Sequence, residues 1–81
     1  MKYKTAQTIV NKLMYNKPVK LRKNKYGAIS VSTWVQLCNV LFNEYNCYNV
    51  TANYNCNNTI AVITAKNPMV GEIVTSKVFL Y

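Results

Sequence analysis

Lysine and arginine are the side chains whose number and spacing in this sequence could do chemistry. Five of the ten fall within nine consecutive positions, as Lys17, Lys20, Arg22, Lys23 and Lys25. Their charged groups can bind phosphate oxygens, and the excess of lysine over arginine favours contact with a phosphate backbone over the reading of bases. This stretch therefore predicts a polyanion-binding surface, with DNA or RNA as the first candidate partner.

The positive charge of the chain is concentrated near its beginning. The net charge is +8, and eight basic residues precede position 26 with no acid among them. Lys12 extends the candidate site, and Tyr26 adds an aromatic ring of the kind that stacks on unpaired bases. Such an asymmetry attracts nucleic acid or an acidic protein surface. Lysines that protect an edge strand from aggregation are the simpler interpretation of the same charges.

Acid–base catalysis has little support in the composition. The chain contains no His and no Asp, and its two acids, Glu44 and Glu72, are 28 positions apart. Cys38, Cys47 and Cys56 have no histidine to activate them, and they do not complete a four-ligand zinc site. We therefore expect a non-catalytic protein with no metal and no cofactor.

Length and composition predict one domain over residues 1–81, with enough hydrophobic residues, 51%, to build a core. No apolar run reaches the roughly 18 residues of a membrane span, and no signal peptide is evident, so we expect a cytoplasmic protein with reduced thiols. The abundance of Asn, Lys and Tyr is typical of AT-rich genomes and favours a viral, phage or mobile-element source. A small domain with an exposed sheet edge can also form a homodimer.

Two amphipathic helices are predicted. In the first, apolar residues spaced three and four apart follow Thr5 as the cap, and the helix ends near Asn16 because a proline comes soon after. In the second, Thr33 and Gln36 form a capping box, and a wide apolar stripe runs to about Tyr45. A stripe of this width is typical of a helix that packs against a sheet.

A basic β-hairpin is predicted between the two helices. Residues 19–23 alternate apolar and basic side chains, which is the period of a half-buried strand. Residues 24–25 make a turn, and residues 27–31 return as a second strand. Lys20 and Arg22 would project from one side of this ribbon, and a two-stranded ribbon fits the major groove of DNA.

Three further strands are predicted in the second half of the chain, over residues 48–54, 59–65 and 77–81. The order α-β-β-α-β-β-β predicts an α+β fold, a mainly antiparallel sheet with the two helices packed on one face. Tyr48 and Tyr54 fall on the apolar side of their strand, so both are expected in the core.

These observations lead to two hypotheses on function. In the first, a small basic protein binds nucleic acid by phosphate contacts through Lys12, Lys17, Lys20, Arg22, Lys23, Lys25 and Tyr26. In the second, a protein-binding module or inhibitor of a host or defence factor occludes an acidic site. Affinity for arbitrary DNA or RNA that falls log-linearly with salt distinguishes the first hypothesis.

Overall fold

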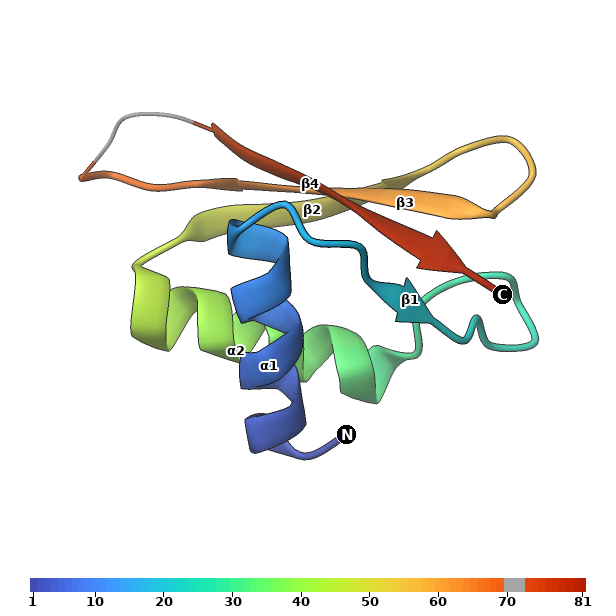
Figure 1. Ribbon diagram of the computed structural model, residues 1–81, viewed down its shortest axis with the longest axis horizontal. Helices are drawn as coiled ribbons and strands as arrows, with labels where there is room; N and C mark the ends of the chain where they lie inside the picture. Colours follow the sequence, from blue (N-terminus) through green and yellow to red (C-terminus); the bar gives the residue numbers. More distant parts are fainter. Residues whose placement is uncertain (70–72) are drawn as a thin grey trace.

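A computed structural model describes residues 1–69 and 73–81, and it shows two helices beneath one face of a four-stranded sheet (Figure 1). The helices are α1, Tyr3–Met14, and α2, Val31–Tyr45. The strands are β1, Lys20–Leu21, β2, Tyr48–Tyr54, β3, Ile60–Lys66, and β4, Ile73–Leu80. The predicted α+β class is confirmed, with both helices on one face of a mainly antiparallel sheet.

In the described part of the chain the strands lie in the order β1-β4-β3-β2. The pairs β2–β3 and β3–β4 are antiparallel, whereas β1 runs parallel to β4. The backbone N–H of Phe79 donates a hydrogen bond of 2.8 Å to the carbonyl of Val19, which attaches β1 to β4. β4 is therefore a central strand with a neighbour on each side.

The core lies between the helices and the inner face of the sheet. It contains Ala6, Val10 and Leu13 of α1, Leu37, Val40 and Leu41 of α2, and Ala61, Ile63, Ala65, Val78 and Leu80 of the sheet. The helical members recur at spacings of three and four residues, and the strand members recur at every second residue. The periodicity of the sequence thus predicted which faces are buried.

Both helices begin earlier than predicted. α1 begins at Tyr3, and no side chain caps it, so Thr5 is not its cap. α2 begins at Val31 because Ser30, and not Thr33, is the cap: the hydroxyl of Ser30 accepts a hydrogen bond of 3.4 Å from the backbone N–H of Thr33. α2 ends at Tyr45 as predicted, and α1 ends at Met14, two residues before the predicted Asn16.

The apolar stripe of α2 is only partly covered by the sheet. The exposed part of the stripe consists of Val31, Val35 and Phe42. The width of the apolar stripe predicted more burial than α2 has, because a single layer of sheet covers one side of a helix and leaves its flanks open.

The prediction of a second hairpin strand is wrong. Residues 27–31 form no strand, because the side-chain oxygen of Asn24 accepts hydrogen bonds from the backbone N–H groups of Tyr26 (2.9 Å) and Ala28 (3.0 Å). These bonds close the chain into a tight loop that leads directly into α2. The first strand of the hairpin does form, as β1, but its partner is β4, nearly 60 positions further along the chain.

Tyr48 and Tyr54 lie on opposite faces of the sheet, whereas the alternating pattern placed both in the core. Asn49 has a φ of 52°, and the register of β2 against β3 shifts at this point, which is a β-bulge. The bulge turns Tyr48 to the outer face, opposite the exposed Lys66. Tyr54 stays on the inner side, where its hydroxyl accepts a hydrogen bond of 3.0 Å from the N–H of Ile29, but it is 38% exposed and not part of the core, so the prediction is wrong for both tyrosines.

Candidate nucleic-acid interface

Backbone hydrogen bonds hold the basic residues of β1 beside the end of β4. The N–H of Tyr81 donates to the carbonyl of Leu21 (3.1 Å), and the N–H of Lys23 donates to the carbonyl of Tyr81 (3.0 Å). In a parallel pair this arrangement places Arg22 opposite Tyr81. Leu21 faces the helices, so Lys20 and Arg22, on either side of it, project from the outer side, and both are exposed.

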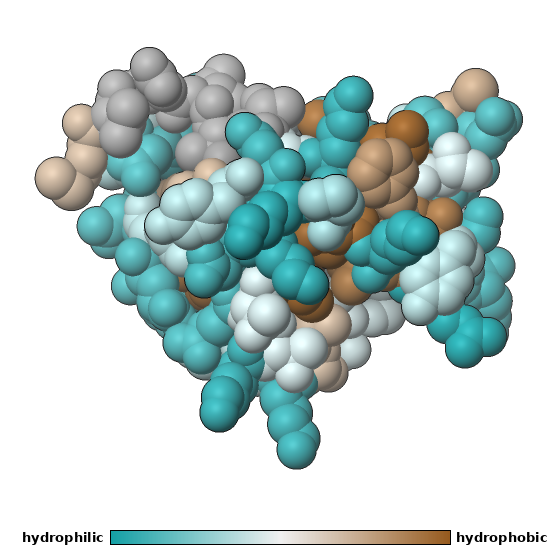
Figure 2. Space-filling view, viewed as in Figure 1, coloured by the Kyte–Doolittle hydropathy of each residue, from teal (hydrophilic) through white to brown (hydrophobic). Residues whose placement is uncertain are grey.

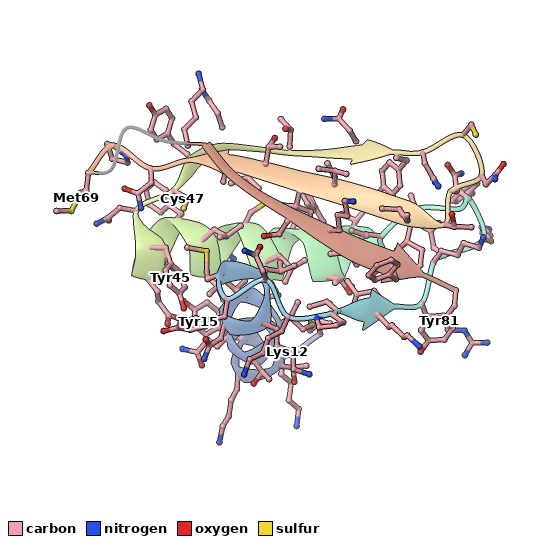
Figure 3. All side chains as sticks on the ribbon, turned by 45° about the horizontal axis from the view of Figure 1, so that its top comes forward. Lys12, Tyr15, Tyr45, Cys47, Met69 and Tyr81 are labelled. Atoms are coloured by element: carbon pink, nitrogen blue, oxygen red, sulfur yellow. The ribbon has the colours of Figure 1, made fainter. Side chains whose placement is uncertain are left out.

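Three shallow hollows in a row connect the end of α1 with the C-terminal end of β4. They are lined in turn by Lys12, Tyr15 and Lys17 (≈ 220 Å³), by Lys17, Lys77 and Phe79 (≈ 340 Å³), and by Lys20, Phe79 and Tyr81 (≈ 500 Å³), among others. Neighbouring hollows share a residue, so the cations between them form one continuous surface. In Figure 3, Lys12 and Tyr15 lie toward one end of this row and Tyr81 at the other.

We call this surface the basic band. Its hollows are lined by Lys12, Lys17, Lys20 and Lys77, and we include Arg22 and Lys23, whose backbone continues from β1 beside Tyr81. Five of these six were predicted from the sequence. The predicted residues Lys25 and Tyr26 lie instead on the loop before α2, where the ammonium group of Lys25 is 5.1 Å from the centre of the Tyr26 ring. The described contacts do not join this pair to the band.

The sequence did not indicate Lys77 as a site residue, because it lies more than 50 positions from the basic stretch 17–25 and no local pattern connects the two. Its exposed side chain lies on β4, two positions before Phe79, and it lines the same hollow as Lys17. Alternation along residues 77–81 was the signal that could have found it, since Val78 and Leu80 are buried and Lys77, Phe79 and Tyr81 are therefore directed outward.

The basic band has no acid in its own segments. Residues 1–43 and 73–81, which supply all of it, contain neither Asp nor Glu. Glu44, at the end of α2, accepts a hydrogen bond of 2.7 Å from the side-chain nitrogen of Gln7. The carboxylate of Glu44 also raises the pKa of Tyr3, mainly by accepting a hydrogen bond from the phenol. Glu44 thus joins α1 to α2.

The outer face of the sheet lies on the side away from both helices (Figure 1). Thr51 and Thr64 face each other across this surface, with their hydroxyl oxygens 2.6 Å apart. Figure 2 shows hydrophobic side chains gathered in the right half of the view, with hydrophilic side chains on both sides of them. The outer face of the sheet therefore carries polar Thr51 and Thr64 together with the exposed Lys77 and Phe79.

Other kinds of site have less support among the described residues. Residues 1–69 and 73–81 hold no group of His, Cys, Asp and Glu side chains that could bind a metal. Cys38, Cys47 and Cys56 are free thiols, and no helix in the described ranges is long and apolar enough to cross a membrane. No protein-family model, curated protein or solved structure matches the chain.

Proposed function

We propose that this protein binds nucleic acid through the basic band, by contacts between its cations and phosphate oxygens. The observation that carries the proposal is the fixed position of Lys17, Lys20 and Lys77 around adjoining hollows, in segments that contain no acid. Cations on a hydrogen-bonded sheet lose little backbone freedom when they bind, so their charge is presented at a low entropic cost.

The proposed mechanism is occupancy without turnover. Each phosphate that a lysine or arginine neutralises releases condensed counterions, and this release supplies most of the free energy of sequence-independent binding. Lysine ammonium groups act as point charges on phosphates, and the guanidinium group of Arg22 adds one bidentate contact. The same proposal includes a cytoplasmic location, which the free thiols support, and a viral or mobile-element source, which the composition supports.

Binding of fluorescent DNA of arbitrary sequence, followed by anisotropy across a salt series, tests this proposal. We expect the logarithm of the association constant to fall linearly with the logarithm of the salt concentration. The double variant Lys20→Gln/Arg22→Gln removes two cations of the band. If both contact phosphates, the slope decreases in magnitude by about 1.4 for single strands or about 1.8 for a duplex.

The matched control is Lys4→Gln/Lys66→Gln, which has the same net charge as the test variant. Lys4 lies in the first turn of α1, at the end that points away from the sheet (Figure 1), and Lys66 lies on β3 opposite Tyr48. The control should keep the slope of the unmodified protein. An equal decrease of the salt slope in both variants would mean that net charge alone attracts DNA and that the band is not the site.

Absence of binding to any DNA or RNA at about 50 mM salt would overturn the proposal, since phosphate contacts are strong at low ionic strength. The basic band would then favour an acidic protein surface as its partner.

A further inference from the structure

We infer that Phe79 on β4 and Tyr81, which directly follows β4, stack the bases of single-stranded nucleic acid, while the basic band holds the phosphates. This inference rests on the proposed function and adds to it the class of nucleic acid. It concerns the two aromatic rings, which no phosphate contact requires.

Phe79 is an exposed aromatic residue in a central strand. It is 41% exposed, while its neighbours Val78 and Leu80 are buried on the other face. Its cross-strand neighbours are Ile60 on β3 and Lys20 on β1. Ile60 is its register partner on β3, and the helices lie beneath the opposite face of the sheet, so the exposed part of the Phe79 ring is accessible from the outer side.

Tyr81 repeats this arrangement two positions further along. Its side chain is 67% exposed, and Arg22 lies opposite it as Lys20 lies opposite Phe79. Each ring thus has a cation beside it on the neighbouring strand. A base stacked on either ring would have its own phosphate within reach of a lysine or an arginine, which is the combination that single-strand-binding proteins use.

The spacing of the two rings selects against a duplex. Two residues along a strand span about 6.6 Å, whereas stacked bases of a duplex are separated by only about 3.4 Å per strand. Adjacent bases must therefore come apart from each other to stack on Phe79 and Tyr81. Unpaired bases do this at a low cost, and exposed aromatic side chains on a four-stranded sheet stack them in RNA-binding domains.

The rings are held in place before binding. Hydrogen bonds from the N–H groups of Phe79 and Tyr81 to the carbonyls of Val19 and Leu21 fix β4 on one side. The N–H of Leu80 donates to the carbonyl of Thr59 at 2.8 Å on the other side. The sheet therefore fixes the backbone that carries both rings, which lowers the entropic cost of binding.

The test compares three probes of equal length at about 50 mM salt: a single strand of about 12 thymidines, an abasic strand with the same phosphates, and a duplex. We expect the thymidine strand to bind more tightly than the abasic strand. Phe79→Ala should weaken binding of the thymidine strand by about 5- to 150-fold, leave binding of the abasic strand unchanged, and leave the salt slope unchanged.

Phe42→Ala is the matched control, because Phe42 is an equally large exposed aromatic side chain, 66% exposed, on α2. It should bind both strands as the unmodified protein does. Phe79→Trp gives a second measurement that does not depend on truncating a side chain. Its indole fluorescence should be quenched by the thymidine strand and not by the abasic strand, relative to the unmodified protein with Trp34 alone.

The outcomes separate the two proposals. Equal affinity for the thymidine and abasic strands, together with unchanged affinity of Phe79→Ala, would overturn the stacking platform and leave phosphate binding by the basic band intact. Tighter binding of the duplex than of the thymidine strand would also overturn it. Absence of binding to all three probes would overturn the proposed function and the platform together.

Discussion

The hydroxyl of Ser76, in the middle of β4, donates a hydrogen bond of 2.8 Å to the backbone carbonyl of Leu13, in the last turn of α1. Ser76 is 7% exposed and is the buried polar residue of the described core. A helix leaves its last carbonyl groups without regular intrahelical partners, and the carbonyl of Leu13 accepts both this bond and one of 3.2 Å from the N–H of Asn16. The bond from Ser76 also fixes the end of α1, with Lys12, against the strand that carries Lys77.

Replacement of Ser76 by alanine should destabilise the fold. Ser76→Ala removes the shorter of two hydrogen bonds to the carbonyl of Leu13, which keeps the N–H of Asn16 at 3.2 Å, so we expect the free energy of unfolding in urea to fall by about 0.5–1.5 kcal/mol. Ser32→Ala, at an exposed position of α2, is the control and should change it by less than about 0.5 kcal/mol. Equal effects of the two substitutions would show that the Ser76 bond contributes nothing to stability.

Tyr54 should contribute to stability through its hydroxyl group. Its oxygen accepts the hydrogen bond from the N–H of Ile29, a residue that is 6% exposed. Tyr54→Phe removes this acceptor, and we expect a loss of about 1 kcal/mol in the free energy of unfolding. Tyr15→Phe, at a ring that is 72% exposed, should have no measurable effect.

The same substitution should loosen the loop before α2. Hydrogen exchange of the Ile29 amide should become faster in Tyr54→Phe, because the bond to Tyr54 protects this amide in the folded protein. An unchanged exchange rate would mean that another group satisfies the Ile29 amide.

The three thiols should differ in reactivity. Cys56 is exposed, whereas burial raises the pKa of both Cys38 and Cys47. A raised pKa lowers the thiolate fraction at any given pH, and the thiolate is the reactive form. Near pH 8, a thiol reagent should therefore modify one equivalent quickly and the other two slowly.

Cys56→Ser should remove the fast phase, and unfolding in urea should make all remaining thiols react at similar rates. Raising the pH should accelerate the slow phases, since it increases the thiolate fraction of Cys38 and Cys47. A fast phase that survives in Cys56→Ser would contradict the assignment.

Local patterns in the sequence predicted much of this fold. Helices and strands, and the faces they bury, follow from the spacing of apolar residues, because a side chain every 3.6 or every 2 residues must face the same side. Five residues of the basic band were also predicted from local patterns. They are close together in sequence, and alternation with Val19 and Leu21 directs Lys20 and Arg22 outward.

The sequence did not predict which strand pairs with β1. A hairpin within residues 19–31 satisfies the local pattern, but the side chain of Asn24 closes a loop there, and β4 supplies the ladder of hydrogen bonds instead. The bulge at Asn49 was equally hidden, because one left-handed residue reverses the face of Tyr48 without altering the apolar pattern.

The sequence by itself therefore determined both helices, four of the five predicted strands, most of their buried faces and the positive charge of the N-terminal third. Only the tertiary structure decided that Lys77, Phe79 and Tyr81 join those charges, since their segment is separated from β1 by more than 50 residues. The physical reason is that backbone hydrogen bonds between distant strands carry no signature in the side chains of either strand alone. That pairing creates the surface on which both functional proposals rest.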